Sequence, residues 1–184
     1  MSLPNLISLA RLLAVPVMIY LILNGYYLAA FGLFVAAGVS DAVDGYIAKK
    51  MGQATVLGSY LDPLADKALL VGVYVTLGHA ELLPTWLVIL VVFRDILIVG
   101  GVVLLHISTN NVKMHPLIVS KINTVAQIVL VVVVLADLAF PQLSWSLLVM
   151  LMIYFVTATT LASGGAYIVS WGKNVDSKNG NDLQ

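Results

Sequence analysis

The chain has 184 residues, of which 61% are hydrophobic and only 10% are charged, and its mean hydropathy is +1.03. These values place it in the membrane class rather than among soluble domains. The absence of cysteine excludes disulfides and thiolate metal sites, and a net charge of zero without a basic tail gives no sign of a nucleic-acid partner. Because the first residues, MSLPNLISLAR, lack the features of a signal or transit peptide, we expect the first apolar segment to be retained.

Six apolar windows of roughly 20 residues, the length that crosses a bilayer as a helix, follow one another along the chain. Short segments rich in Gly, Pro and Asn separate them. The pattern predicts an all-α integral membrane protein with six transmembrane helices, a membrane domain over residues 1–172 and a polar C-terminal tail over 173–184. The predicted helices cover residues 4–23, 27–49, 55–78, 84–105, 116–137 and 143–171.

The distribution of lysine and arginine in the loops predicts the orientation of the helices. Six spans place both termini on one face, and the loops and tail of that face hold all the Lys residues outside the spans, whereas the opposite loops hold no Lys or Arg. Positive residues are retained on the cytoplasmic side, so we expect both termini to be cytoplasmic. The residues in question are Lys49, Lys50, Lys113, Lys173 and Lys178.

Charged residues within the predicted spans gather at one depth. An insertion scale assigns roughly 2.5 to 3.5 kcal/mol to such a residue at mid-membrane, so these groups need compensation. Their common depth predicts a polar cavity in the cytoplasmic half of the protein, with Arg94 and Asp95 nearer the midplane. Counted from the cytoplasmic end of each span, the residues within about three turns are Arg11, Asp41, Asp44, Asp62, Asp66 and Lys121.

The four aspartates form two pairs, each on one helical face. Asp41 and Asp44 are spaced i, i+3, and Asp62 and Asp66 are spaced i, i+4. Like charges this close in low dielectric take up protons unless a cation lies between them. Ligation by oxygen alone favours Mg²⁺, Mn²⁺ or Ca²⁺ over zinc, and four carboxylates suffice for two ions.

The glycines and the aspartates of this stretch each allow a second interpretation. Gly45, beside Asp44, and Gly58, one turn before Asp62, leave a cavity wall open to a planar ligand, or they serve helix contacts. The aspartates themselves would also be neutralised by ion pairs with basic residues inside the spans, for which Lys67, Arg94 and Lys121 are the candidates. Ion pairing alone would not require the glycines or the i, i+4 repeat.

The stretch from Asp41 to Asp66 reads D-x2-D-G-x2-A-K-x8-G-x3-D-x3-D and resembles the signature of the CDP-alcohol phosphatidyltransferases. Lys49 departs from it, because the family usually has arginine there. The segment LPNLISLARLLAVP is similar to the family's first helix, and LDPLADK and FRD recur in its phosphatidylglycerophosphate and cardiolipin synthases.

The resemblance implies transfer of a phosphatidyl group from CDP-diacylglycerol to an alcohol, with release of CMP. The segment HPLIVSKINTVAQ is more similar to the CMP-forming cardiolipin synthases, whose acceptor is phosphatidylglycerol. Phosphatidylglycerophosphate synthases tend to carry lysine in place of Asn123, and losing a cation suits a phosphodiester acceptor better than glycerol 3-phosphate. That second acceptor is the alternative. A divalent cation transporter is less favoured, because the sequence shows no pair of interrupted spans in matching halves.

The resemblance also implies a homodimer and roles for individual residues. The missing transit peptide favours a bacterial cytoplasmic membrane, and the loop lysines place the active site on its cytoplasmic side. Asp66 would take the proton from the attacking hydroxyl. Two divalent ions, Mg²⁺ or Mn²⁺, would be bound by Asp41, Asp44, Asp62 and Asp66. The CDP-lipid would be bound by Asn5, Ser8, Asp41, Gly45, Lys49 and Gly58, and the acceptor by Arg94, Lys121, Arg11 and Lys67.

Overall fold

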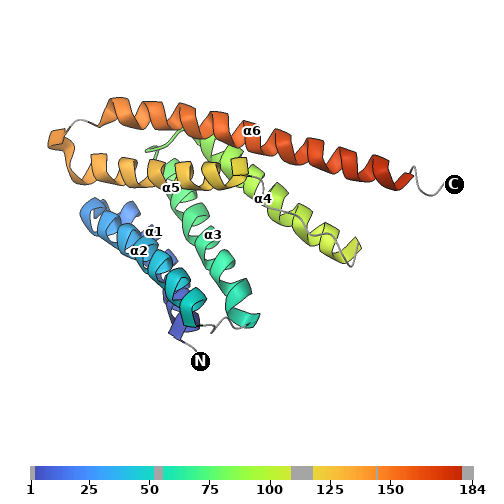
Figure 1. The fold of residues 1–184 in the computed structure, drawn as a ribbon. Helices are drawn as coiled ribbons and strands as arrows, with labels where there is room; N and C mark the ends of the chain where they lie inside the picture. The colour runs from blue at the N-terminus through green and yellow to red at the C-terminus, as the bar shows by residue number, and fades with distance from the viewer. Residues whose placement is uncertain (1–2, 52–55, 109–117, 144, 180–184) are drawn as a thin grey trace. The chain divides into compact units, whose positions relative to one another are not determined.

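The computed structural model describes the backbone of residues 3–51, 56–108, 118–143 and 145–179, and side chains within 9–41, 65–98, 100, 118–143 and 145–167. The described residues are helical and contain no strand, which confirms the predicted all-α class (Figure 1). The elements are α1 (Leu3–Leu23), α2 (Tyr27–Met51), α3 (Val56–His79), α4 (Thr85–Ser108), α5 (Ile118–Ala139), the short 3₁₀ helix η1 (Pro141–Leu143) and α6 (Ser146–Asn179).

The helix boundaries agree with the apolar windows, apart from the end of α6. The sequence predicted that this helix ends at Trp171 and that a polar tail follows, but α6 continues to Asn179. The segment after Trp171 contains no proline, and extending an existing helix by one residue costs far less than starting a new one. Polar composition alone therefore did not mark the helix end.

The two short turns that follow α1 and α3 share one geometry. After α1, the amide of Tyr26 donates to the carbonyl of Leu21, and the amide of Gly25 donates to that of Ile22. This is the Schellman pattern, in which the residue after the helix adopts positive φ, here 73° at Gly25. The same pattern ends α3, but there Glu81 takes the positive φ, at 60°.

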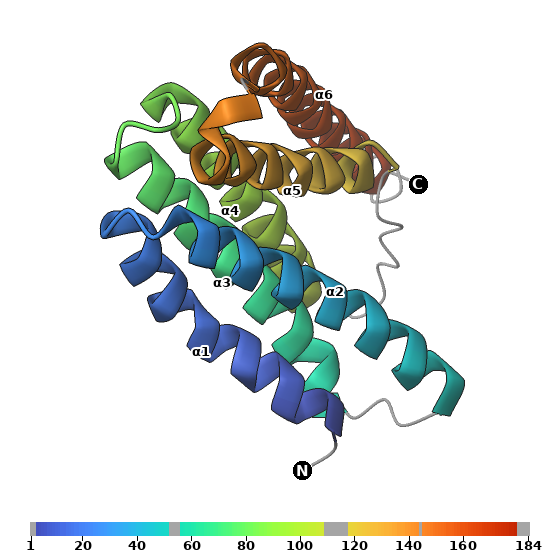
Figure 2. The same cartoon turned by 90° about the vertical axis from the view of Figure 1, so that its left-hand side faces the viewer.

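The chain divides into two compact units, and we describe each by itself. The first comprises Met1–Thr85 and Leu130–Val149. Within it, α1 packs against both α2 and α3, and these helices lie side by side in both views (Figures 1 and 2). A Cβ atom added at Gly72 of α3 would lie 3.1 Å from Cγ1 of Val15, so α1 and α3 approach closely at this glycine. Fully buried side chains of this unit include Met18, Ile22, Val73, Tyr74, Leu77, Leu130 and Leu135.

Aromatic and polar contacts fix the end of α5 in the first unit. The rings of Phe31 and Phe140 meet edge to face, with centroids 5.9 Å apart. Asp137 accepts a hydrogen bond of 3.0 Å from the backbone amide of Trp145, just before α6 begins. A carboxylate here satisfies an amide that has no partner within the helix, so Asp137 acts as a cap.

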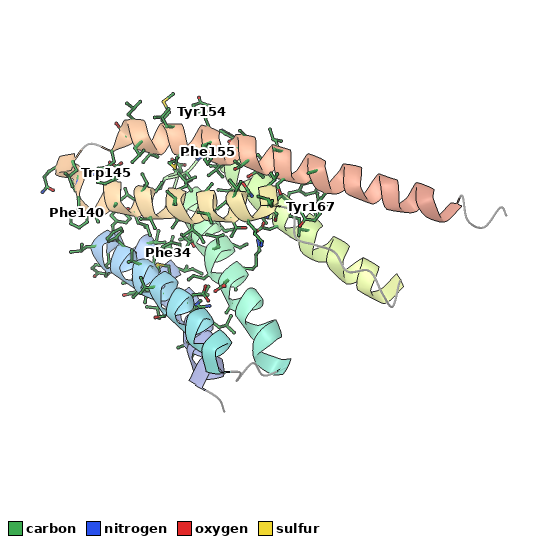
Figure 3. The ribbon with its side chains drawn as sticks, viewed as in Figure 1. Phe34, Phe140, Trp145, Tyr154, Phe155 and Tyr167 are labelled. Carbon is green, nitrogen blue, oxygen red and sulfur yellow. The ribbon has the colours of Figure 1, made fainter. Side chains whose placement is uncertain are left out.

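The second unit comprises Trp86–Val129 and Met150–Gln184. Large apolar side chains project from its helices, including Tyr154 and Phe155 of α6 (Figure 3). The segments Ile118–Ala139 and Ser146–Tyr167 are long and apolar enough to cross a membrane. Outward-facing apolar side chains are what lipid contact requires, whereas Arg94, Asp95 and Asn123 of this unit are buried.

Candidate acidic site and interhelical polar network

The first unit brings a basic residue between two of the predicted acidic ligands. Arg11 lies on α1, Asp41 on α2 and Asp66 on α3. Nη1 of Arg11 lies 2.9 Å from Oδ1 of Asp41 and also donates a hydrogen bond to Oδ1 of Asp66. One nitrogen therefore links α1, α2 and α3. The sequence predicted that the charged residues of these helices lie at a common depth in the membrane.

Carboxylates from two helices lie close together in this arrangement. Since both oxygens contact one nitrogen at hydrogen-bond length, they lie within about 6 Å of each other. The Arg11 side chain is 4% exposed, whereas the side chains of Asp41 and Asp66 are 47% and 44% exposed. The arginine is thus buried behind two carboxylates that are open to incoming ligands.

The remaining predicted residues of this site lie outside the described side chains. Their backbones fall within the bounds of α1, α2 and α3. The described residues alone contain no group of three or more acidic or histidine side chains that would hold a metal ion. The predicted site residues outside the described side chains are Asn5, Ser8, Asp44, Gly45, Lys49, Gly58 and Asp62.

The described part of the site fits a divalent cation of the magnesium type. Asp41 and Asp66 supply half-exposed carboxylate oxygens from two neighbouring helices, with no sulfur or imidazole ligand among the described residues. Hard cations such as Mg²⁺ and Mn²⁺ take this donor set. Ion pairing is also present at this site, since Arg11 contacts both carboxylates.

A second basic residue, Arg94 of α4, lies in a buried polar network of the second unit. Its Nε and Nη2 donate to Oγ of Ser163 at 3.2 and 2.6 Å, Nη2 donates to Oγ of Ser120 at 2.6 Å, and Nη1 donates to Oδ1 of Asp95 at 2.8 Å. Arg94 and Asp95 are only 3% and 4% exposed. The guanidinium therefore ties α4 to α5 and α6.

The contact between Arg94 and Asp95 joins adjacent residues of one helix. Adjacent residues on a helix point about 100° apart, so one of the two side chains has to bend toward the other. The arginine side chain is long enough to fold back along its own helix and meet the carboxylate. The two buried charges therefore neutralise each other at this contact.

The other two predicted acceptor-binding residues are more accessible than Arg94. Lys121 of α5 is exposed, and Lys67 of α3 is partly buried. Of the predicted acceptor-binding residues, Arg11 contacts the acids, Arg94 is hydrogen-bonded within a buried network, and Lys121 is exposed. The predicted polar cavity and the cytoplasmic orientation stay predictions.

Asn123 joins α5 to α6 one turn beyond Ser120. Its Oδ1 accepts hydrogen bonds from Oγ1 of Thr159 at 2.8 Å and of Thr160 at 2.9 Å, and the side chain is fully buried. Nδ2 of Asn123 is buried without a hydrogen-bond partner among the described residues. Hydrogen bonds from two threonines of α6 therefore fix the neutral amide of Asn123.

Sequence reasoning did not select the hydroxyl residues of this network. Ser120, Thr159, Thr160 and Ser163 are ordinary in composition, and serine and threonine in apolar helices commonly bond to their own backbone. Their spacing is the signal that would have helped, since Thr159 and Ser163 are four residues apart, as are Ser120 and Thr124. A polar stripe at helical spacing within an apolar helix indicates an interhelical contact.

Comparison with known proteins identifies the relatives of this chain. Residues 1–162 match the family described as CDP-alcohol phosphatidyltransferase. A chloroplastic CDP-diacylglycerol–glycerol-3-phosphate 3-phosphatidyltransferase of Oryza sativa subsp. japonica is 38% identical over 188 residues, covering 93% of this chain and 57% of the relative. The human cardiolipin synthase (CMP-forming) is 33% identical over 184 residues, covering 90% of this chain and 60% of the relative.

A Bacillus subtilis CDP-diacylglycerol–glycerol-3-phosphate 3-phosphatidyltransferase is 33% identical over 160 residues, covering 78% of this chain and 82% of the relative. The chain thus spans less than two thirds of the rice and human proteins but most of the bacterial one. Relatives named as glycerol-3-phosphate phosphatidyltransferases and as a cardiolipin synthase thus match at 33% to 38% identity.

Proposed function

The chain belongs to the CDP-alcohol phosphatidyltransferase family, and we propose that it transfers a phosphatidyl group from CDP-diacylglycerol to phosphatidylglycerol, forming cardiolipin and releasing CMP. The observation that carries the proposal is the joint contact of Arg11 with Asp41 and Asp66. It supports a site in which the first aspartate of the motif on α2 and the last aspartate on α3 act on one ligand.

The proposed ligands of two divalent ions are Asp41, Asp44, Asp62 and Asp66. When bound, Mg²⁺ or Mn²⁺ would neutralise the diphosphate of the CDP-lipid and stabilise CMP as the leaving group. We assign recognition of the CDP-lipid to Asn5, Ser8, Gly45, Lys49 and Gly58 together with Asp41.

Asp66 is the proposed general base. The acceptor hydroxyl oxygen forms a bond to the phosphorus of the phosphatidyl group, its proton goes to the carboxylate of Asp66, and the bond between that phosphorus and the CMP oxygen breaks. The half-exposed side chain of Asp66 suits contact with an incoming hydroxyl. A base must lie within hydrogen-bond reach of the proton that it removes.

The neutral side chain of Asn123 supports phosphatidylglycerol as the acceptor. Glycerol 3-phosphate carries a phosphate monoester with a charge near minus two, whereas phosphatidylglycerol offers a phosphodiester with a single charge. Asn123 has a neutral, fully buried amide that accepts hydrogen bonds from two threonines. We assign Lys121, which is exposed on α5, to the acceptor, together with Arg94 of α4 and Lys67 of α3.

Glycerol 3-phosphate is the second candidate acceptor. It is favoured by the rice relative, whose name specifies that acceptor and whose identity to this chain is 38%, against 33% for the human cardiolipin synthase. The chemistry at CDP-diacylglycerol is the same in both cases, so the acidic site does not separate them.

We further propose that the protein lies in a bacterial cytoplasmic membrane, with both termini and the site on the cytoplasmic side, and that it forms a homodimer. The orientation is supported by the positions of the lysines in the loops. The homodimer is supported by Gly164 and Gly165 of α6, which have no atom of the described residues within 4 Å of an added Cβ. Small residues left open on a helix allow close approach of a second one.

Reconstitution with each acceptor tests the proposed reaction. The purified protein is placed in vesicles with CDP-diacylglycerol and Mg²⁺, and phosphatidylglycerol and glycerol 3-phosphate are supplied in separate reactions. We expect cardiolipin and CMP from the first reaction only. A product formed only from glycerol 3-phosphate would establish the alternative, and divalent-ion flux into sealed vesicles without either lipid would favour transport.

A further inference from the structure

Arg11 occupies the position that a cation would take between Asp41 and Asp66. From this geometry we infer that Arg11 is a positioning residue of the acidic site, which holds the two carboxylates together in the metal-free protein and competes with the divalent cation for their oxygens. The inference rests on the proposed function, because it assumes that these aspartates bind metal. It moves Arg11 from the acceptor group to the acidic site.

The exposure of the three side chains indicates the side from which a divalent cation reaches the carboxylates. Arg11 is 4% exposed, while Asp41 and Asp66 are about half exposed. A cation that approaches from the exposed side therefore meets the carboxylates first and Arg11 last. Arg11 has little surface for direct contact with an acceptor phosphate, so its effect is transmitted through the two aspartates.

The type of contact indicates that Arg11 can yield to a stronger ligand. Arginine binds a carboxylate most strongly through two parallel N–H groups. Here the single nitrogen Nη1 makes both contacts, one to each carboxylate, and the buried Nε has no hydrogen-bond partner among the described residues. The guanidinium thus bridges two acids without the bidentate geometry of a permanent pair.

The charge balance predicts two opposite effects when Arg11 is replaced by a neutral residue. In the described contacts of Arg11, one positive charge faces two negative charges, and this balance leaves a net negative charge that attracts a divalent cation. Without Arg11, Asp41 and Asp66 repel each other in the metal-free protein, which lowers its stability. The same change removes a competitor and a repulsive charge close to the metal, which raises the metal affinity.

A contact between Arg11 and the acceptor, or a purely structural ion pair, predicts a different result. Loss of an acceptor contact leaves Mn²⁺ binding unchanged in the absence of lipid substrate. Loss of a structural ion pair lowers stability equally with and without Mn²⁺. Mn²⁺ affinity and thermal stability therefore separate the three roles without any measurement of turnover.

The test compares the full-length wild-type protein with Arg11→Met and Arg11→Lys in detergent. Mn²⁺ binding is followed by the electron paramagnetic resonance signal of the free ion, and unfolding is followed in EDTA and in saturating Mn²⁺. We expect Arg11→Met to bind Mn²⁺ at least about tenfold more tightly than wild type. We also expect its unfolding midpoint to be lower in EDTA and to recover more on addition of Mn²⁺.

Arg11→Lys keeps the positive charge but places it on a single ammonium group at the end of a shorter side chain. We expect the Mn²⁺ affinity of this variant to lie between those of wild type and Arg11→Met. It carries the test alone if Arg11→Met does not fold in EDTA. Glu81→Gln is the control, because it changes one charge at an exposed turn of the same unit, outside the proposed site. Its Mn²⁺ affinity should equal that of wild type.

Two failures of the test have different meanings. Unchanged or weaker Mn²⁺ binding by folded Arg11 variants overturns the inference alone, because the wild-type protein still binds metal. Absence of Mn²⁺ binding to the wild-type protein overturns the metal site of the proposed function, and the inference with it.

Discussion

Arg94 of α4 and Ser163 of α6 are joined by two hydrogen bonds, from Nε at 3.2 Å and from Nη2 at 2.6 Å to the same hydroxyl oxygen. Ser163 is fully buried, and Arg94 is 3% exposed. The guanidinium also meets Ser120 and Asp95, so a charge that is costly in an apolar helix is neutralised and solvated by the protein itself. Arg94 therefore has a structural role whatever it does with the acceptor.

Replacement of Arg94 by methionine tests this structural role. The Arg94→Met variant removes the guanidinium from a buried carboxylate, and we expect a loss of about 3 to 5 kcal/mol in the free energy of unfolding. The double variant Arg94→Met/Asp95→Leu removes both charges and should recover most of that loss. The measurement is denaturant unfolding in detergent, and equal stability of the single variant and wild type would contradict the network.

Thr160 and Thr157 form a matched pair on α6 for testing the contact with Asn123. The hydroxyl of Thr160 donates to Asn123 on α5, whereas the hydroxyl of Thr157 donates to the carbonyl of Ile153 in its own helix. Thr160→Val should lower the free energy of unfolding by about 1 kcal/mol, and Thr157→Val should change it by less than about 0.5 kcal/mol. Equal effects of the two changes would show that the interhelical bond contributes nothing specific.

Glu81 and Gly25 occupy equivalent positions in two Schellman turns and predict opposite responses. Glu81 has a φ of 60°, which costs a residue with a side chain about 1 kcal/mol that glycine avoids. Glu81→Gly should therefore raise the thermal unfolding midpoint. Gly25→Ala should lower it, even though nothing lies within 4 Å of the added Cβ, because the φ of 73° is unfavourable for alanine. Destabilisation by both changes would contradict this account of the turns.

Asp66→Asn tests the assignment of the general base and metal ligand. The amide is isosteric with the carboxylate but takes up no proton and binds divalent cations poorly, so we expect CMP release to fall by at least about 10³-fold. The protein should stay folded in detergent. Glu81→Gln makes the same acid-to-amide change at an exposed turn and should keep normal activity. Normal turnover by purified Asp66→Asn would rule out the assigned role.

The helices were predictable because each needs a long apolar segment, and the turns between them carry strong breakers such as the Asn-Gly pair before Tyr26. The end of α6 was not predictable, since the polar residues after Trp171 neither favour nor forbid a helix. The spacing of the acids predicted that each pair lies on one helical face, and one member of each pair, Asp41 and Asp66, contacts Arg11.

The partners of the charged residues were not predictable from the sequence. Arg11 was assigned to the acceptor, because one helix does not reveal which residue of another helix it meets. Asp137 was overlooked as a boundary residue, yet it caps α6. Ser120 and Ser163 surround Arg94 only because α4, α5 and α6 come together in the second unit. Each of these contacts depends on helix packing, which a pattern along one segment does not encode.

The central claim is that carboxylates of α2 and α3 hold divalent cations on the diphosphate of a CDP-lipid. Its most direct measurement is CMP release from CDP-diacylglycerol by protein that has been stripped with EDTA, in the presence of phosphatidylglycerol. We predict no CMP release in the chelator and full recovery when Mg²⁺ or Mn²⁺ is added in excess. Undiminished CMP release in EDTA would contradict the claim.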